Sequence, residues 1–432
     1  MLVIKGGNLV DPGNINGVFD IFIQDGKIAV IRESGTSKEP LGAEDTVVDA
    51  SGKIVTPGLI DMHVHLREPG HEYKETIASG TMAAAAGGFT AVCCMPNTNP
   101  VNDSSEVTEY IIEKAKKSGK ARVYPVASIS RGLSGENLSE FGELKKSGAV
   151  AVTDDGLPVS NSQLMRRAME YAMGFGLPVI SHAEDLKLAG QGLMNEGPAA
   201  TRMGLAGIPN AAESVMVMRD IALCELTGAR LHIAHVSTLE SVYAIRDAKK
   251  RGLPVTAETA PHYFSLTDED ISGYDANYKM NPPLRSSRDK EAVRQGLADG
   301  TIDAIATDHA PHSPLEKNLE FSRAANGIIG LETALPLGLK LVEDKVITFE
   351  SLVEKLSKNP ARILGLQSGL AEGGPADITV IDPGLPHTIN ADLFFSKSRN
   401  TPFNGWQLKG KALLTVVGGR IVFDELINSK RL

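Results

Sequence analysis

Two histidines separated by one residue, His63 and His65, are the first residues whose types and spacing indicate chemistry. They follow an apolar run that ends in Leu59-Ile60, so we expect them at the end of a β-strand. Residues i and i+2 of a strand project from the same face, so the two imidazoles aim at one point, as two ligands of one metal ion must. The alternative is an ordinary strand with two polar residues at its end. The neighbours favour a metal site, because Asp61 precedes the pair and Arg67 follows it.

Further polar side chains follow other apolar runs, at the points where more strands are expected to end. They are Asn97, Asp154, Asp155, His182, His235, Asp308, His309 and His312. A single buried histidine commonly has only a structural role. Several strands that each end in a histidine or a carboxylate indicate one shared site, if the fold brings these ends together.

The elements that must position these side chains alternate between strand and helix. Eight apolar, β-rich runs lie at 54–65, 89–97, 122–130, 148–155, 178–182, 231–235, 254–259 and 302–308, with helical stretches such as 74–86, 104–118, 160–173 and 211–226 between them. Eight βα repeats over about 300 residues predict an α/β fold, a TIM (β/α)8 barrel, whose active site lies at the C-terminal strand ends. An open doubly wound sheet is the alternative, but no Gly-rich phosphate loop follows the first strand.

The two ends of the chain have a different texture. Residues 1–55 and 365–432 carry short β-rich runs punctuated by glycine turns. Neither piece is large enough for a core of its own, so we expect them to form one small β-sandwich together. The sequence therefore predicts two domains, the composite β-sandwich of 1–55 and 365–432 and the catalytic barrel of 56–364.

Composition narrows the range of partners. The chain has 432 residues and a net charge of −9, from 44 basic and 53 acidic residues. No cluster of lysine and arginine stands out, so we expect no nucleic-acid partner and no anionic membrane surface. The first residues lack the layout of a signal peptide, and no apolar run reaches membrane-spanning length. These features predict a cytoplasmic protein that acts on a small molecule.

The candidate ligands define the chemistry. They are His63, His65, His182, His235, an aspartate after the fourth strand, and Asp308. Six nitrogen and oxygen ligands exceed the shell of one tetrahedral zinc, so we expect two divalent ions, roughly 3.5–4 Å apart. These ligands suit zinc, although cobalt, manganese and iron also accept them. A water between two such ions becomes a hydroxide near neutral pH, and Asp308 can pass its proton to a leaving nitrogen as general base and then acid. The site predicts hydrolysis, or its reverse, at an amide-like carbonyl.

Along its full length the chain resembles the dihydroorotase family of the amidohydrolase superfamily. Residues 61–69, DMHVHLREP, match one family signature, and residues 306–312, ATDHAPH, with Lys317 beyond them, match the other. Residues 359–362 (NPAR) and 375–378 (PADI) match superfamily features. The resemblance implies the reversible cyclisation of N-carbamoyl-L-aspartate to (S)-dihydroorotate and water, in the de novo synthesis of pyrimidines (UMP).

The resemblance also distributes the ligands. It implies one metal held by His63, His65 and Asp308, and a second held by His182 and His235. Many relatives bridge the two metals with a carboxylated lysine, but residues 151–156, AVTDDG, contain none. This matches the subgroup in which an aspartate bridges, and alignment with it assigns the bridge to Asp155. Asp154, on the opposite face of the strand, is the alternative. Occupancy of the second zinc site varies in this subgroup.

Arg67 carries the argument for the substrate. A guanidinium suits a carboxylate bound through two hydrogen bonds, whereas a structural ion pair with Glu68 is the alternative. Dihydroorotate has a carboxylate, but hydantoins and allantoin have none, and allantoinase-like relatives carry a neutral residue at this position. The resemblance implies substrate contacts from His65, Arg67, Asn97, Asn281, His312 and the backbone of Asn326 and Gly327. Many relatives have an aromatic residue where Asn326 stands.

Two rival functions remain open from the sequence. One is another cyclic amidase, such as a hydantoinase or an allantoinase, against which Arg67 and the missing lysine argue. The other is an inactive scaffold for aspartate transcarbamoylase, against which the complete set of candidate ligands argues. The resemblance further implies a homodimer and a complex with aspartate transcarbamoylase. The polar segment 312–325 is expected to be either a flexible loop over the substrate or a plain surface loop.

Overall fold

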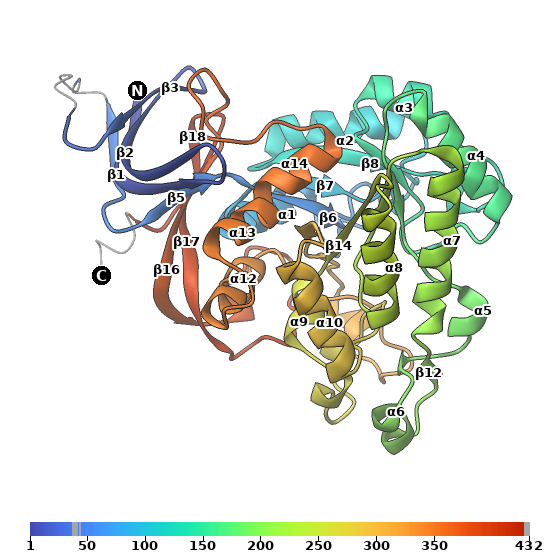
Figure 1. Cartoon of the computed structure of the whole chain (residues 1–432). Helices are drawn as coiled ribbons and strands as arrows, with labels where there is room; N and C mark the ends of the chain where they lie inside the picture. The colour runs from blue at the N-terminus through green and yellow to red at the C-terminus, as the bar shows by residue number, and fades with distance from the viewer. Residues whose placement is uncertain (37–41, 43–44, 427–432) are drawn as a thin grey trace.

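The computed structural model describes residues 1–36, 42 and 45–426, and its centre is a barrel of parallel strands (Figure 1). The strand order is β15-β14-β13-β10-β9-β8-β7-β6. The bounds are β6 (Leu59–Val64), β7 (Phe89–Cys94), β8 (Arg122–Ala127), β9 (Ala151–Thr153), β10 (Val179–Ser181), β13 (Leu231–Ile233), β14 (Val255–Thr259) and β15 (Ala304–Ile305). The first strand meets the chain beyond the last one, because the His65 N–H donates to the His309 carbonyl at 2.8 Å. The predicted TIM barrel is confirmed.

Helices surround the strands, and the predicted ones are present (Figure 1). They are α1 (Ile77–Ala86), α2 (Ser105–Ser118), α3 (Phe141–Ser147), α4 (Ser162–Met173), α5 (Leu186–Ala189), α6 (Pro198–Met203), α7 (Ala211–Thr227), α8 (Leu239–Lys250), α9 (Pro261–Ser265), α10 (Ser287–Ala298), α11 (Pro314–Lys317), α12 (Ala334–Glu343), α13 (Phe349–Val353) and α14 (Asn359–Leu364). The helix predicted from residue 74 begins at Ile77 instead. The cause is Thr76, whose side chain accepts a hydrogen bond from the Ser79 N–H at 3.1 Å and so caps the helix.

The first predicted strand, 54–65, is two strands in the structure. β5 (Ile54–Pro57) pairs with strands of the terminal sheet, and β6 continues into the barrel. Gly58 lies between them, where a Cβ atom would stand 2.0 Å from Thr90 Oγ1. Only glycine allows this approach of the backbone to β7. The chain therefore crosses from one sheet to the other at a residue with no side chain.

Strands from both ends of the chain form the terminal sheet. Its order is β18-β17-β16-β5-β1-β2-β3, with β4 beside β1. The bounds are β1 (Leu2–Asp11), β2 (Ile15–Gln24), β3 (Lys27–Glu33), β4 (Thr46–Asp49), β16 (Ile378–Thr388), β17 (Gln407–Val417) and β18 (Arg420–Asp424). Its apolar core is separate from the barrel core and draws on both ends, for example Ile4, Ile21, Ile378 and Val416. The two termini therefore share one β-rich unit, while the division at residues 55/56 and 364/365 stays a prediction.

One segment of the C-terminal part leaves the terminal sheet. Between β16 and β17 the chain passes through η5 (Ala391–Leu393) and then runs to the C-terminal end of the barrel strands. We call residues 394–403 the arm. Buried and exposed residues alternate in the first part of the arm: Ser396, Ser398 and Asn400 are each at most 4% exposed, whereas Phe395, Lys397 and Arg399 are exposed. A segment outside the predicted barrel thus reaches the end of the barrel where the candidate ligands lie.

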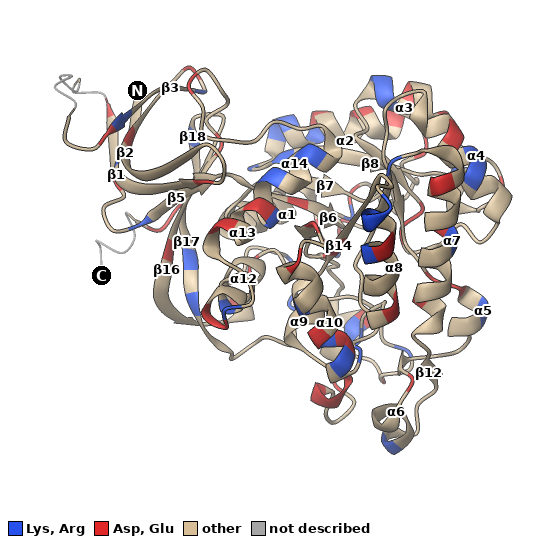
Figure 2. Ribbon diagram, in the orientation of Figure 1, with Lys and Arg blue, Asp and Glu red and all other residues tan. Residues whose placement is uncertain are grey.

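Charges of both signs are spread over the outer helices (Figure 2). Lysine and arginine alternate there with aspartate and glutamate, for example in the exposed pairs Lys116–Glu113 and Arg251–Glu225. No helix within the described residues is long and apolar enough to cross a membrane.

Candidate active site

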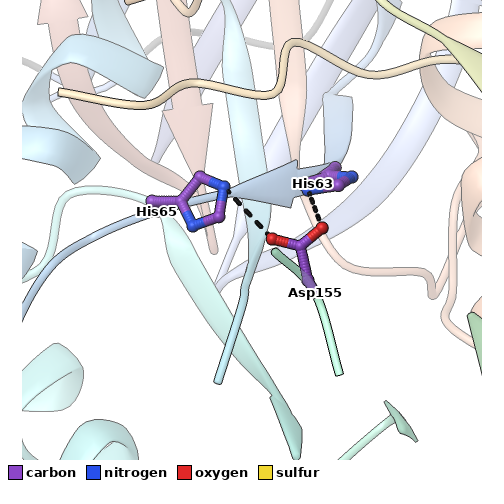
Figure 3. Close-up of side chains that lie close together, drawn as sticks. All are labelled: His63, His65 and Asp155. Atoms are coloured by element: carbon purple, nitrogen blue, oxygen red, sulfur yellow. Dashed lines mark ion pairs between the residues drawn. The ribbon is translucent and has the colours of Figure 1, made fainter. Parts of the chain in front are cut away.

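Asp155 lies at the centre of a buried cluster of ligands beyond the barrel strands. The two histidines of the first strand face its carboxylate, as Figure 3 shows. His63 Nε2 is 3.2 Å from Asp155 Oδ1, and His65 Nε2 is 3.5 Å from Oδ2. Asp308 Oδ1 completes this group, 3.1 Å from His65 Nε2 and 3.6 Å from His63 Nε2. The spacing of the two histidines therefore places both imidazoles on one point, as the sequence predicts.

Two further histidines face the same carboxylate from the other side. His182 Nδ1 is 3.5 Å and His235 Nε2 is 3.7 Å from Asp155 Oδ1. These two nitrogens lie 2.8 Å from each other. They follow the fifth and sixth barrel strands, β10 and β13, which pair directly, so the pairing of these strands brings the two histidines together.

The cluster fits divalent metal ions. Ligands at 2.0–2.2 Å from a tetrahedral ion stand roughly 3.3–3.6 Å apart, close to the separations found here. Two groups, His63 with His65 and Asp155, and Asp155 with His182 and His235, each have ligand atoms within 4.8 Å of one another, and they share Asp155. His63 Nε2 is buried and has no hydrogen-bond partner among the described residues. A buried imidazole nitrogen without a partner is costly unless a ligand occupies it.

Electrostatics keep the two carboxylates charged. Burial alone raises the pKa of Asp155, but His63, His182 and His235 hold that pKa well below its ordinary value. Burial likewise opposes ionisation of Asp308, yet its hydrogen bond with His65 and the nearby His63 lower its pKa. Both side chains are therefore anionic, as candidate ligands of a metal ion must be.

Buried partners orient the imidazoles. Glu258 on β14 lies 2.7 Å from His63 Nδ1, which turns His63 Nε2 toward Asp155. Asn97 Oδ1 lies 2.9 Å from His65 Nδ1, and Glu184 Oε2 lies 3.4 Å from His182 Nε2. Such contacts fix the tautomer and raise the basicity of a ligating histidine. Neither Glu258 nor Glu184 was predicted from the sequence. Glu184 could have been, because it stands two residues after His182, but Glu258 is 195 positions from its partner His63.

The two aspartates after the fourth strand have different surroundings. Asp154 accepts a hydrogen bond from the Ser130 N–H at 2.9 Å, so it points away from the cluster. The structure brings Asp155, not Asp154, to the histidines, which agrees with the alignment. Asp61 is also structural: its Oδ1 accepts from the His63 N–H at 3.2 Å and the Thr307 N–H at 3.1 Å. Burial raises the pKa of Asp61 to about 7.

The backbone bends sharply at three residues of the site. Arg67, His235 and Asp308 have φ values of 63°, 35° and 50°, in the left-handed region that non-glycine residues rarely adopt. Such conformations cost of order 1–3 kcal/mol and cluster at functional sites, where the surrounding structure holds them. They direct these three side chains into one cavity.

The cavity above the ligands has a volume of about 210 Å³. Its lining includes every residue predicted to contact substrate: His65, Arg67, Asn97, Asn281, His312, Asn326 and Gly327. Asp155, His182, His235 and Asp308 also line it. This volume is below the roughly 300–1,000 Å³ of pockets for drug-sized ligands, so the cavity suits a small molecule.

Arg67 has no carboxylate partner. Its Nε donates to the Pro311 carbonyl at 3.2 Å, and no ion pair within the described ranges involves its guanidinium. Glu68, the alternative partner, instead lies 2.9 Å from Lys114 Nζ and accepts from the Ile77 N–H at 2.8 Å. Burial lowers the pKa of Arg67, but a guanidinium stays charged in proteins. A partly buried cation therefore lines the cavity without an ion-pair partner among the described residues.

His312 lies beside this guanidinium and stays neutral. Its Nε2 donates to the Asn326 carbonyl at 2.8 Å and lies 3.5 Å from Arg67. Burial, with Arg67, Lys74 and Lys317 nearby, lowers the pKa of His312 to about 3. The positive charge on this side of the cavity thus belongs to Arg67.

Comparisons with known proteins agree with this geometry. A family profile described as "Dihydro-orotase-like" matches residues 52–241. A protein of Desulforapulum autotrophicum named dihydroorotase is 61% identical over 427 residues, which are 99% of this chain and 100% of that protein. The chain belongs to the dihydroorotase family. A dihydroorotase of Geobacter metallireducens is 60% identical over 425 residues, covering 98% of this chain and 99% of the relative.

Solved structures place the dihydroorotase family fold beside that of hydantoinases. The chain superposes on L-hydantoinase (dihydropyrimidinase) of Arthrobacter aurescens with a TM-score of 0.86 at 26% identity, over 98% of this chain and 96% of that one. For D-hydantoinase (dihydropyrimidinase) of a Thermus species the values are 0.83, 25%, 99% and 96%. The chain therefore has an amidohydrolase fold of barrel and β-rich terminal unit, and the substrate must be argued from the cavity.

Proposed function

We propose that the chain is a dihydroorotase, catalysing the reversible cyclisation of N-carbamoyl-L-aspartate to (S)-dihydroorotate and water in pyrimidine biosynthesis. The observation that carries this proposal is Arg67. A partly buried guanidinium that forms no ion pair among the described residues, beside a cluster of candidate metal ligands, suits a substrate that brings its own carboxylate. Dihydroorotate has that group next to a cyclic amide, and hydantoins do not.

Zinc is the proposed metal, in two sites that share Asp155. His63, His65 and Asp308 would hold one ion, and His182 and His235 the other. Bound zinc supplies Lewis acidity, which lowers the pKa of a water molecule and polarises a carbonyl oxygen. Imidazole and carboxylate ligands support this choice.

Asp308 is the proposed proton carrier. In the hydrolytic direction an oxygen of water joins the ring carbonyl carbon, the bond from that carbon to the ring nitrogen breaks, and Asp308 delivers to the nitrogen the proton that it took from the water. In cyclisation the same proton moves back. Its place in the lining of the cavity, beside the candidate metal ligands, supports this role.

Substrate is held on the opposite side of the cavity. Arg67, Asn97 and His312 are the proposed contacts for the carboxylate, and His65 also lies within reach. Asn281 and the backbone of Asn326 and Gly327 are the proposed contacts for the ring amides. Asn281 is fixed by its own donation to Glu184 Oε2 at 2.9 Å. A neutral His312 is able to accept or donate a hydrogen bond without repelling Arg67.

The test is an assay of dihydroorotate hydrolysis, monitored through the loss of its ultraviolet absorbance. Hydantoin is assayed in parallel as the alternative substrate. We expect turnover of dihydroorotate, loss of activity with a chelator, recovery with zinc and little activity on hydantoin. Metal analysis of the protein purified without added metal gives the identity and number of ions independently. Absence of dihydroorotate turnover by protein shown to contain metal would overturn the proposal.

The sequence-based expectations on assembly and location remain part of this proposal. We infer a cytoplasmic homodimer that forms a complex with aspartate transcarbamoylase, whose product is N-carbamoyl-L-aspartate. Mass measurement in solution, with and without the transcarbamoylase, tests both parts.

A further inference from the structure

Asn400 in the arm bonds to three backbone groups around the substrate cavity. Its Nδ2 donates to the Ala310 carbonyl at 3.0 Å and to the Gly327 carbonyl at 3.0 Å. Its Oδ1 accepts from the His312 N–H at 3.2 Å. Ala310, His312 and Gly327 all line the cavity, whereas Asn400 is 4% exposed and does not. Asn400 thus touches the backbone that carries the proposed substrate contacts, from behind.

Only a carboxamide satisfies this set of partners. Two carbonyl oxygens need two N–H donors, and one N–H needs an acceptor, which fixes the orientation of the Asn400 amide. An aspartate would keep the acceptor but place a carboxylate against the two carbonyl oxygens. The backbone here has little freedom to adjust, because Gly327 has φ +122° and a Cβ there would lie 2.6 Å from Ala310 Cβ.

The arm is itself anchored to the barrel by a buried carboxylate. Glu75, which is fully buried, accepts from Ser396 Oγ at 2.5 Å and from the Lys397 N–H at 3.2 Å. The same carboxylate lies 3.4 Å from His309 Nε2. The Ile329 N–H also donates to the Asn400 carbonyl at 2.9 Å. The arm therefore contacts the segment after the eighth strand on both sides of Ala310, through Glu75 at His309 and directly at His312.

We propose that Asn400 is a positioning residue for substrate, which holds His312 and the Asn326-Gly327 backbone at the carboxylate and ring-amide side of the cavity. The inference rests on the proposed function for the identity of the substrate. On this proposal the arm, which lies outside the barrel strands, supports the backbone that lines the substrate cavity. Asn400 has no contact with a metal ligand in the described structure, so its effect belongs to substrate binding and not to metal binding.

The test compares Asn400→Asp with a matched change, Asn404→Asp. Asn404 is exposed and uses only its Oδ1, which accepts from the Ala391 N–H at 2.9 Å, so an aspartate keeps that bond. We expect Asn400→Asp to raise KM for dihydroorotate about tenfold or more and to change kcat far less, because displaced binding groups weaken ground state and transition state alike. Metal content stays at the wild-type level, and Asn404→Asp behaves as wild type.

Hydrogen exchange gives a readout that does not depend on turnover. We expect the backbone amides of residues 308–328 to exchange faster in Asn400→Asp than in wild type. In Asn404→Asp we expect the wild-type exchange rate. If wild-type protein does not hydrolyse dihydroorotate, the proposed function fails while the exchange result still decides the positioning role. An unchanged KM in an active Asn400→Asp enzyme overturns the inference. Asn400→Ala serves as the second variant, and failure of both to fold, or loss of metal from either, contradicts a role confined to substrate.

Discussion

Arg67 combines an unfavourable backbone conformation with a charged side chain that faces the substrate cavity. Its backbone is in the left-handed region, its guanidinium is partly buried, and it donates to the Pro311 carbonyl but forms no ion pair among the described residues. Asp308, Asp155 and Glu316 attract the charge only from a distance. This arrangement favours a bound anion and supports the proposed role of Arg67 in binding the substrate carboxylate.

Replacement of Arg67 by alanine tests this reading. We expect KM for dihydroorotate to rise strongly, because a charge-assisted pair with a carboxylate is worth about 2–5 kcal/mol. We expect little change in thermal stability, because Arg67 forms no ion pair among the described residues. Steady-state kinetics and thermal unfolding measure the two effects, with Arg131→Ala, at an exposed ion pair with Glu140, as control. An unchanged KM would show that the carboxylate binds elsewhere.

Glu258 differs from Arg67, since it does not line the cavity and contacts the cluster through His63. Its carboxylate holds His63 Nδ1 at 2.7 Å and also lies 3.2 Å from His232 Nε2. We expect Glu258→Gln to weaken metal binding by about 10- to 100-fold, the usual cost of losing a partner of a ligating histidine. Competition with a chromogenic chelator measures it. Metal affinity equal to wild type would mean that packing alone orients His63.

Residue types at strand ends predicted much of this site from the sequence. His182 and His235 were found because a parallel barrel collects the C-terminal ends of its strands, whatever their distance along the chain. Glu258 and Asn400 were not found, because their contacts depend on side-chain directions of residues far apart in sequence. Nothing in the residues next to Asn400 indicates that its side chain is buried behind the cavity.

At the scale of elements, the arm is held by two carboxylates with unlike surroundings. Glu75 is bonded by hydroxyl, amide and imidazole groups, whereas Glu332 accepts only from the Phe395 N–H at 3.0 Å and the Ser396 N–H at 3.2 Å. Burial raises the pKa of Glu332 from an ordinary 4.5 to about 7, and the nearby Glu75 adds to this. The arm therefore includes a carboxyl group that is more stable in its neutral form.

This pKa predicts how stability varies with pH. Between about pH 4.5 and 7 the folded protein keeps the Glu332 proton and the unfolded chain loses it, so Glu332 favours folding at acidic pH and this contribution is lost as pH rises. We expect Glu332→Gln to be stabilised relative to wild type by up to about 3 kcal/mol more at the upper end of this window than at the lower.

Denaturant unfolding of both proteins across the window measures the difference. Glu343→Gln is the control, because Lys409 lowers the pKa of Glu343 and moves its titration below the window. A constant difference between Glu332→Gln and wild type would mean that Glu332 is ionised throughout.

The sequence predicts which barrel strands exist better than it predicts where each element begins and ends. Continuous apolar runs predicted all eight barrel strands, because strands buried on both faces carry such runs. The break at Gly58 was not visible, since Ile54–Pro57 and Leu59–Val64 read as one run and differ only in the sheet that each joins. The loop 312–325 was likewise ambiguous. In the structure it contains α11, and Lys317 Nζ donates to the Lys279 and Ala325 carbonyls at 2.9 and 2.8 Å.

At the scale of the molecule, the terminal sheet and the barrel are joined by more than their two chain crossings. The Arg122 guanidinium of β8 lies 2.7 Å from Asp377, just before β16, and the arm reaches across to the cavity. The pairing of the termini was predictable from their shared texture. Their contribution to the site was not, because it depends on the path of the arm.

Metal removal tests how far the site supports the whole fold. Without metal, four buried histidines face two buried carboxylates, and His63 Nε2 makes no hydrogen bond among the described residues. An ion that binds the folded state and not the unfolded state stabilises the fold by about 2.7 kcal/mol when its free concentration is a hundred times Kd. We expect a chelator to lower the melting temperature by several degrees, and zinc to restore it together with activity.

The double variant His182→Asn with His235→Asn separates the two proposed sites. It keeps His63, His65, Asp155 and Asp308, so we expect one bound ion per chain in place of two, and a smaller shift in melting temperature on chelation. Metal analysis and calorimetry on the same samples give both numbers. If wild-type protein and the double variant bound the same number of ions, Asp155 would serve a single metal, and His182 and His235 would have to act on substrate or on water.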